Sequence, residues 1–250
     1  MSETGLSWLP AVPEDWGARL RALTASATPA DDWRALVSLA QVRLGLSETT
    51  RLDRKITAVM GNAPPEGIGT RPVRLALLSS CTVDHLVPAL RVGALRRGLW
   101  LDVYVADFGQ YAQELDNPAS ALHAFRPDVV LFSFDAHHLT AGLMPGMENA
   151  EAVIAERLEH VRRQWARARG TVNATVIQQT ILPTLPGLVG NNEYRMAGSR
   201  AAAVHRLIAG FRPVATAGGV ALLAAHPPFP RAGLAPWPPP RLSLLPKSLS

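Results

Sequence analysis

Residues 74–98, RLALLSSCTVDHLVPALRVGALRRG, decide the fold that this sequence predicts. An apolar run at 75–78 leads into a small polar turn at 79–82, and apolar residues then recur at helical spacing until Gly98. This pattern is typical of a buried strand, a tight turn and a helix, which together open an α/β sheet. Ligands of such folds bind where the strands end, so chemistry is expected first at this turn.

The composition allows a full hydrophobic core and favours a reducing compartment. The chain has 250 residues, 48% of them hydrophobic, and one cysteine, Cys81, so that no internal disulfide can form. The N-terminus lacks the basic region and apolar run of a signal peptide, and no stretch approaches the roughly 18 apolar residues of a membrane span. We therefore expect a cytoplasmic protein that does not enter a membrane.

The positive charge of the chain does not by itself indicate a nucleic-acid-binding protein. The net charge is +5, but the arginines are scattered over the expected helices, without interleaved aromatic residues or a nucleic-acid motif. Solvated helix faces explain this charge better than a nucleic-acid groove does. An acidic protein partner remains open.

The sequence pattern divides the chain into three parts. Residues 1–70 form a helical N-terminal segment that ends in a linker rich in glycine and proline. Residues 71–226 alternate between strands and helices and form an α/β domain. Residues 227–250 contain too many prolines for regular structure, and we expect them to be extended or disordered.

The α/β domain is predicted to contain a five-stranded parallel sheet. Its longer helices are expected at about 84–97, 149–169 and 199–211. Apolar runs place the strands at about 73–79, 101–106, 128–134, 173–178 and 219–223. With right-handed crossovers, these elements form a three-layer, flavodoxin-like sandwich.

The N-terminal segment is expected to pack on the α/β domain rather than to remain separate. Its three helices are predicted to begin near Asp15, Pro29 and Ser47. Six apolar residues at helical spacing need a partner surface: Trp33, Leu36, Leu39, Leu44, Leu52 and Ile56.

The carboxyl ends of the expected strands bring several residues that can carry chemistry to one edge of the sheet. They are Cys81, Gly109, Asp135, His137, His138, Gln178, Gln179 and His226, and the loop at 190–193 can reach the same edge. The adjacent histidines have no second ligand pair at metal-site spacing, so we expect neither a metal nor another cofactor.

Cys81 is the candidate nucleophile. It is placed where backbone N–H groups begin a helix, and the positive end of the helix dipole favours a thiolate there, although Asp84 opposes this effect. A nucleophilic Cys81 should have a pKa below the free value of about 8.5. The alternative is a small buried residue at a tight turn, where cysteine packs well.

Gly109, Asn192 and three histidines could support such a nucleophile. A turn that contains Gly109 can aim an N–H at a developing oxyanion, and Asn192 can donate a side-chain N–H to the same atom. His137, His138 and His226 are candidate general bases. Each residue also has a structural alternative: a turn glycine, a loop asparagine, or a surface or hydrogen-bonded histidine.

Two stretches of the chain closely resemble the N-terminal domain of FkbH-like proteins. They are SSCTVDHLVPALRVGALRRG at 79–98 and DFGQYAQELDNPASALHAFRPDVVLFSFDAHHL at 107–139. The similarity extends more weakly over 31–60, 178–183 and 234–250. In that family the domain is similar to SGNH hydrolases, so the resemblance implies an SGNH-hydrolase-like sandwich for the α/β domain.

The resemblance also implies an activity. FkbH-like domains precede a haloacid-dehalogenase-like (HAD) domain, and the pair loads a glyceryl unit onto an acyl carrier protein in polyketide-type biosynthesis. Aligned with SGNH motifs, the turn at 79–81 takes the place of Gly-Asp-Ser, which implies Cys81 as the nucleophile and Ser80 in the oxyanion or substrate site. Gly109 matches the glycine block, and the loop at 190–192 matches Gly-x-Asn.

Two features of the family are missing from this sequence. The Asp-x-Asp-x-Thr motif of the HAD domain is absent, so phosphate-ester chemistry is not expected from this chain. The Asp-x-x-His block is broken, because Leu223 stands three residues before His226. A complete serine-hydrolase triad is therefore not expected.

Three hypotheses for the function remain open. The first is acyl (glyceryl) transfer to an acyl carrier protein through a Cys81 thioester, with Gly109 and Asn192 holding the oxyanion and His226 or His137 handling the proton. The second is a non-catalytic docking domain for a carrier protein or for a separate HAD-type, phosphatase-like subunit. The third is a stand-alone SGNH-like esterase.

Overall fold

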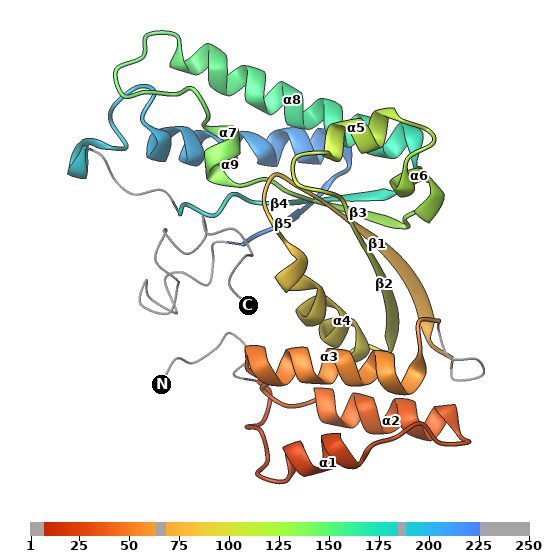
Figure 1. The fold of residues 1–250 in the computed structure, drawn as a ribbon. Coiled ribbons are helices and arrows are strands. Elements are labelled where there is room, and N and C mark those ends of the chain that lie inside the picture. The colour runs from red at the N-terminus through yellow and green to blue at the C-terminus, as the bar shows by residue number, and fades with distance from the viewer. Residues whose placement is uncertain (1–7, 64–68, 185–188, 226–250) are drawn as a thin grey trace. The chain divides into compact units, whose positions relative to one another are not determined.

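The computed structural model describes residues 8–63, 69–184 and 189–225 (Figure 1). The chain divides into two compact units. The first unit comprises residues 1–75 and 83–105, and the second unit comprises residues 76–82 and 106–250. The expected irregular tail, residues 227–250, lies outside the described residues.

A five-stranded parallel sheet forms, as predicted. Its strands are β1 (Arg71–Ser79), β2 (Leu99–Val105), β3 (Val129–Ser133), β4 (Thr175–Gln179) and β5 (Ala221–Leu223). Their order is β2-β1-β3-β4-β5. Val129 of β3 lies opposite Thr175 of β4, and Gln178 lies opposite Leu222 of β5. The predicted α/β fold, with a helical segment ahead of the sheet, is confirmed.

β1 and the turn that follows it agree closely with the sequence prediction. The strand ends at Ser79, and helical structure begins at Asp84 with a short 3-10 turn, η1 (Asp84–Leu86), that leads into α4 (Val87–Leu95). Leu77 and Leu78 are almost completely buried, which explains why this apolar run forms a central strand. Pro88 stands in the first turn of α4, where no backbone N–H is needed.

The first unit is held together by one hydrophobic core. Its helices are α1 (Trp16–Ala22), α2 (Pro29–Ala40), α3 (Leu46–Met60) and α4. All six apolar residues that were expected to need a partner surface lie in this core with Val92 and Leu95 of α4 and Trp100 of β2. Each large apolar side chain buried in this way contributes about 1.5–3 kcal/mol. The prediction that the N-terminal helices pack on α/β elements is confirmed.

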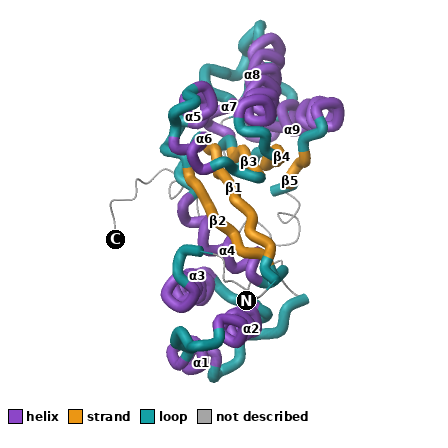
Figure 2. Tube along the Cα trace, turned by 90° about the vertical axis from the view of Figure 1, so that its right-hand side faces the viewer, coloured by secondary structure: helices purple, strands orange, loops and turns teal. Residues whose placement is uncertain are grey.

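The second unit carries its long helices on one side of β3, β4 and β5 (Figures 1 and 2). Its helices are α5 (Tyr111–Asp116), α6 (Ala121–Phe125), α7 (Ala136–Leu139), α8 (Ala150–Thr171) and α9 (Arg200–Gly218), with a 3-10 turn η2 (Gly190–Asn192). Trp165 of α8 joins the layers: its ring lies 6.1 Å from that of Phe211 in α9, and its Nε1 donates to Gln178 Oε1 of β4 at 2.9 Å.

Two features of the second unit differ from the sequence prediction. Helix α9 was expected to end at Phe211 but continues through Pro213 to Gly218. Phe211 and Ala215 on either side of the proline are both buried, and this burial offsets the cost of a proline inside a helix. The short helices α5, α6 and α7 were not predicted, because four to six residues are too few to show a helical period.

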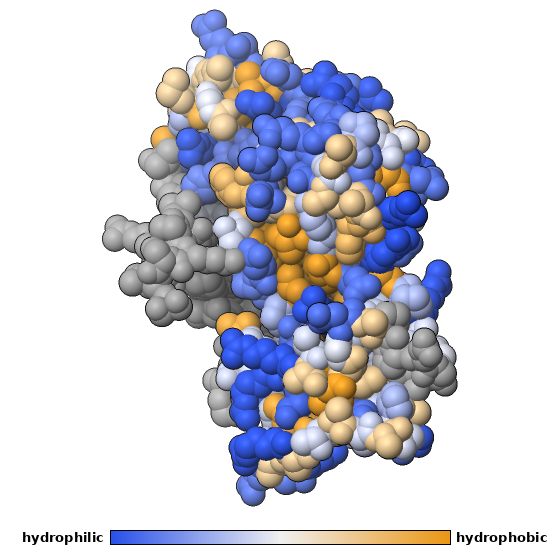
Figure 3. Space-filling view, turned by 45° about the vertical axis from the view of Figure 1, so that its right-hand side comes forward, coloured by the Kyte–Doolittle hydropathy of each residue, from blue (hydrophilic) through white to orange (hydrophobic). Residues whose placement is uncertain are grey.

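Within the described residues, no helix is long and apolar enough to cross a membrane. The face drawn in Figure 3 mixes hydrophilic and hydrophobic side chains.

Candidate functional site

The turn after β1 is fixed to the turn after β3 by two hydrogen bonds between Ser80 and Asp135. Ser80 Oγ donates to Asp135 Oδ2 at 2.7 Å, and the Asp135 backbone N–H donates back to Ser80 Oγ at 2.9 Å. The Ser80 N–H also donates to the Ser133 carbonyl at 3.2 Å. Ser80 is only 4% exposed, so these bonds lie where water competes little and the local dielectric is low.

Asp135 also caps helix α7. Its Oδ1 accepts a hydrogen bond from the His138 backbone N–H at 2.9 Å. The Asp135 carboxylate thus accepts on both oxygens: one accepts from the Ser80 hydroxyl, and the other accepts from the His138 N–H at the start of a helix.

Cys81 is a free, partly exposed cysteine in the same turn. Its carbonyl accepts a hydrogen bond from Ser79 Oγ at 2.6 Å, which tightens the turn. Burial raises the pKa of the Cys81 thiol to about 11, and the negative charge of Asp135 adds to that rise. The thiol is therefore protonated at neutral pH, and the direction of its pKa shift is opposite to the one expected of a nucleophilic Cys81.

Gly109 lies in an exposed turn that follows β2. Its φ of +69° falls in the left-handed region, which favours glycine. The Ala106 N–H donates to the Leu77 carbonyl at 3.1 Å and ties the start of this turn to β1. The Gly109 N–H donates to none of the described residues, so it is available to a ligand.

Asn192 is the last residue of η2, and its side chain is exposed. Its carbonyl accepts from the N–H groups of Arg195 and Met196 at 2.9 and 3.1 Å. The neighbouring Glu193 is buried and accepts from the Val189 N–H at 2.7 Å, so a side chain fixes the loop from within. No described hydrogen bond joins the Asn192 side chain to the turn of Cys81.

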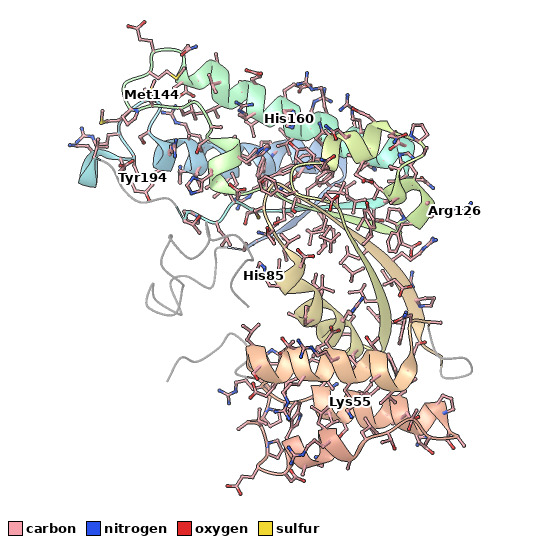
Figure 4. All side chains as sticks on the ribbon, in the orientation of Figure 1. Lys55, His85, Arg126, Met144, His160 and Tyr194 are labelled. Carbon is pink, nitrogen blue, oxygen red and sulfur yellow. The ribbon has the colours of Figure 1, made fainter. Side chains whose placement is uncertain are left out.

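The loop of Asn192 is tied to the loop that follows α7. The Gly146 N–H donates to the Ala197 carbonyl at 2.8 Å, and a side chain at Gly198 would overlap the Met144 carbonyl. Figure 4 labels one residue of each loop, Met144 and Tyr194, and both are exposed.

The three predicted histidines differ in their hydrogen bonds and in whether the described residues include them. His137 is half-buried in α7 and has no hydrogen bond to a described side chain. His226 lies outside the described residues. His138, the other member of the pair, is tied by its backbone to Asp135 and by its ring to a network that sequence reasoning missed.

That network centres on the hydroxyl of Tyr111. Tyr111 Oη lies 2.9 Å from His138 Nε2 and 3.0 Å from His160 Nε2, and the tyrosine is only 4% exposed. The rings of Phe134 and His138 lie 5.7 Å apart and pack on the same cluster. No sequence signal marked this group, because its members come from three different helices and share no spacing motif.

Burial governs the titration of this network. It lowers the pKa of His138 and of His160 and raises the pKa of Tyr111. The positive charge of Arg157 lowers both histidine pKa values further, whereas Asp135 works against the lowering at His138. Both rings are therefore neutral near pH 7, and each can accept a proton only in acid.

The arrangement combines a protonated thiol, a hydrogen-bonded carboxylate beside it and a neutral histidine pair. The structure brings Ser80, Asp135 and His138 together, whereas no described hydrogen bond links Gly109 or Asn192 to them. Among the described residues, no group of three or more histidine, cysteine, aspartate or glutamate side chains could hold a metal ion. Once a base removes its proton, a thiol in this arrangement can attack an acyl carbon.

Residues 74–189 match the family model of the FkbH N-terminal domain. The resemblance expected from the sequence is confirmed over this stretch, which contains Cys81, Gly109 and His137. Among the curated proteins, none matches the sequence.

The solved structures with a similar fold include the following two. One is the N-terminal part of BF1531 from Bacteroides fragilis, which contains a phosphatase domain complexed with Mg; it aligns with a TM-score of 0.61 and 15% identity over 76% of this chain and 48% of that one. At this identity the similarity shows the fold alone, and this chain spans about half the length of that structure. The other, a candidate SGNH hydrolase from Slackia heliotrinireducens, aligns with a TM-score of 0.41 and 18% identity over 70% of this chain and 94% of that one.

Proposed function

We propose that the FkbH N-terminal domain found at residues 74–189 serves acyl (glyceryl) transfer to an acyl carrier protein, with Cys81 as the group that takes the acyl unit. The observation that carries the proposal is the place of Cys81: it is partly exposed in the turn after β1, beside a carboxylate that two hydrogen bonds to Ser80 hold in position. The small neighbours Ser80 and Thr82 leave the turn uncrowded.

The proposed transfer has two steps. In the first, the Cys81 sulfur attacks the acyl carbon of an activated donor; the S–C bond forms, and the leaving group departs with the proton that the thiol gave up. In the second, the thiol of the carrier protein attacks this thioester, the acyl unit moves to the carrier, and Cys81 regains a proton.

The raised pKa of Cys81 makes proton removal the demanding part of the first step. His137 and His226 are the proposed proton acceptors, and Gly109 and Asn192 are the proposed oxyanion or substrate-binding residues. Ser80 was expected in the same site, but it donates its hydroxyl to Asp135 and its N–H to the Ser133 carbonyl, so it holds the turn and has no donor left for an oxyanion. The free N–H of Gly109 supports its part in this assignment.

The proposed partners are an acyl carrier protein and a separate HAD-type domain or protein. A structure of similar fold contains a phosphatase domain, and this chain spans 48% of it. The phosphatase domain of that structure is the support for proposing a phosphatase-like partner.

A non-catalytic docking domain is the second candidate. The raised pKa of Cys81 favours it, because a thiol that stays protonated at neutral pH is a poor nucleophile. In that case the same domain binds a carrier protein or a phosphatase-like partner without taking an acyl group itself.

Intact-mass measurement after incubation with activated acyl donors separates these functions. We expect one acyl mass on the wild-type protein and none on Cys81→Ala. Thr82→Ser is the matched control, since it changes an exposed neighbour and keeps the thiol; it should acylate like the wild type. Absence of acylation in the wild type, together with retained binding of a carrier protein, would leave the docking domain.

A further inference from the structure

One tyrosine hydroxyl joins three helices of the second unit. Tyr111 is the first residue of α5, His138 lies in α7 and His160, labelled in Figure 4, lies in α8. Both imidazole Nε2 atoms lie within 3.0 Å of the same phenolic oxygen. Because the tyrosine is buried, losing both bonds would leave its hydroxyl without a partner in this network.

One hydroxyl hydrogen cannot serve both bonds. When both histidines are neutral, one Nε2 accepts the tyrosine hydrogen and the other donates its own hydrogen to the tyrosine oxygen. The two rings must therefore hold opposite tautomers. A proton added to the accepting ring turns its Nε2 into a donor, which leaves the tyrosine hydrogen with no acceptor in the network. Protonation of the accepting ring therefore breaks this arrangement, whereas the donating ring can take a proton on its Nδ1 and keep its bond.

Most of the charged groups that act on the network are positive and oppose protonation of the two histidine rings. On α8, Arg157 acts on both rings and on the tyrosine, and Arg163 and Arg167 act on His160. A proton on the α7 ring also opposes one on the α8 ring. Asp135, which precedes α7, is the negative group that favours protonation of the α7 ring.

The network continues to the turn of Cys81 through helix α7. This helix has four residues and is too short to be stable without outside contacts. Burial of Ala136 and Leu139 anchors it in the unit, and His138 adds two hydrogen bonds: the ring pairs with Tyr111, and the backbone N–H donates to Asp135 Oδ1. Asp135 in turn holds Ser80 and acts on the thiol of Cys81.

We propose that Tyr111, His138 and His160 form a proton-sensitive clamp that positions Asp135 beside Cys81. While the clamp is closed, the fixed carboxylate disfavours the thiolate. When a proton enters the accepting ring, α7 loosens and the carboxylate no longer holds its place at the thiol. The clamp acts on the thiol whether or not Cys81 carries an acyl group; only its part in catalysis rests on the proposed function.

The first test uses the wild-type chain and needs no variant. Long-range proton–nitrogen NMR spectra of the histidine rings report both tautomer and protonation between pH 5 and 8. We expect His138 and His160 to hold opposite tautomers at pH 8 and to titrate below the ordinary value of 6.5. Equal tautomers would overturn the clamp.

The second test follows iodoacetamide alkylation of Cys81 against pH in Tyr111→Phe. Freeing Asp135 lowers the midpoint of the alkylation profile, so the rate at pH 8 should rise roughly threefold or more. Because burial is the larger cause of the raised pKa, loosening that merely exposes the thiol would also lower the midpoint. The double variant Tyr111→Phe/Asp135→Asn separates the two causes: its midpoint should equal that of Asp135→Asn alone, and a further fall would overturn the proposal.

Two further variants distinguish the effect of protonation from the effect of losing the hydrogen bond. His160→Gln keeps a hydrogen-bonding group toward Tyr111 but cannot take a proton, so it should retain the wild-type alkylation midpoint. His205→Gln is the control, since His205 is exposed on α9, and it should change neither measurement. A midpoint in His160→Gln as low as that in Tyr111→Phe would contradict the positioning role. Loss of acylation with an intact clamp would count only against the proposed function.

Discussion

Ser80 and Asp135 exchange two hydrogen bonds, at 2.7 and 2.9 Å, between turns that follow different strands. The same carboxylate caps α7 and raises the pKa of Cys81. The position of one buried serine side chain therefore affects both the stability of the turn and the reactivity of the thiol.

Ser80→Ala should destabilise the protein by about 1–3 kcal/mol, because Asp135 Oδ2 and the Asp135 N–H both lose their partner. Urea unfolding measures the change. Thr82→Ala, at an exposed position of the same turn, is the control and should stay within about 0.5 kcal/mol of the wild type. Equal effects of the two variants would contradict the structural role of the serine.

Asp135→Asn should lower the pKa of Cys81 from its value of about 11, because the variant removes the negative charge that disfavours the thiolate. Burial is the larger cause and remains, so the pKa should stay above the free value of about 8.5. The pH profile of iodoacetamide alkylation, read by mass spectrometry, shows whether the pKa of Cys81 falls below that of the wild type and whether it stays above the value of a free thiol. An unchanged midpoint would show that the carboxylate does not act on the thiol.

Acid should destabilise the second unit through His138 and His160. Because the folded state lowers both pKa values, the unfolded state binds protons more readily. Their contribution to stability is complete above the unfolded value near 6.5 and is lost as the pH falls through the folded pKa. Urea unfolding at pH 8 and pH 5.5 should show this loss, and the double variant His138→Gln/His160→Gln should reduce it. An equal loss in the double variant would assign the acid sensitivity to other groups.

Two glycine substitutions should change stability in opposite directions. Gly109→Ala places a side chain at a φ of +69° and should cost about 1–2 kcal/mol. Gly93→Ala lies inside α4, where an added Cβ meets nothing within 4 Å, and should stabilise by up to about 1 kcal/mol. Melting temperatures of both variants measure this, and the same sign for both would contradict the assigned backbone conformations.

Leu36→Ala should destabilise the first unit by about 2–5 kcal/mol, because Leu36 is fully buried in the core between the helices. Leu46→Ala removes the same atoms from a side chain that is 75% exposed and should have little effect. If the two variants unfolded alike, the N-terminal helices would not depend on this core.

The elements whose signal lies in neighbouring residues of the chain were predicted correctly from the sequence. The strand of β1, the turn after it and the helical start at Asp84 follow from the apolar run and the residue types of 74–98. The core helices α2 and α3 follow from helical periodicity, and their partner surface follows from the need to bury that face. The sequence predicted helix α9 only as far as Phe211. The helix continues beyond Pro213 because Phe211 and Ala215 are buried in the packed unit, and this burial does not show in the local sequence.

The turn that contains Cys81 was predictable from the sequence alone, because a buried strand followed by small polar residues and a helical period is a local pattern. Its electrostatics were not. The sequence placed Asp135 and His138 at the same sheet edge as Cys81, but the hydrogen bonds of Asp135 to Ser80 and the clamp of Tyr111, His138 and His160 were decided by the tertiary structure. A pKa depends on burial and on charges close in space, so the protonation of Cys81 was decided by packing rather than by the residues beside it in the chain.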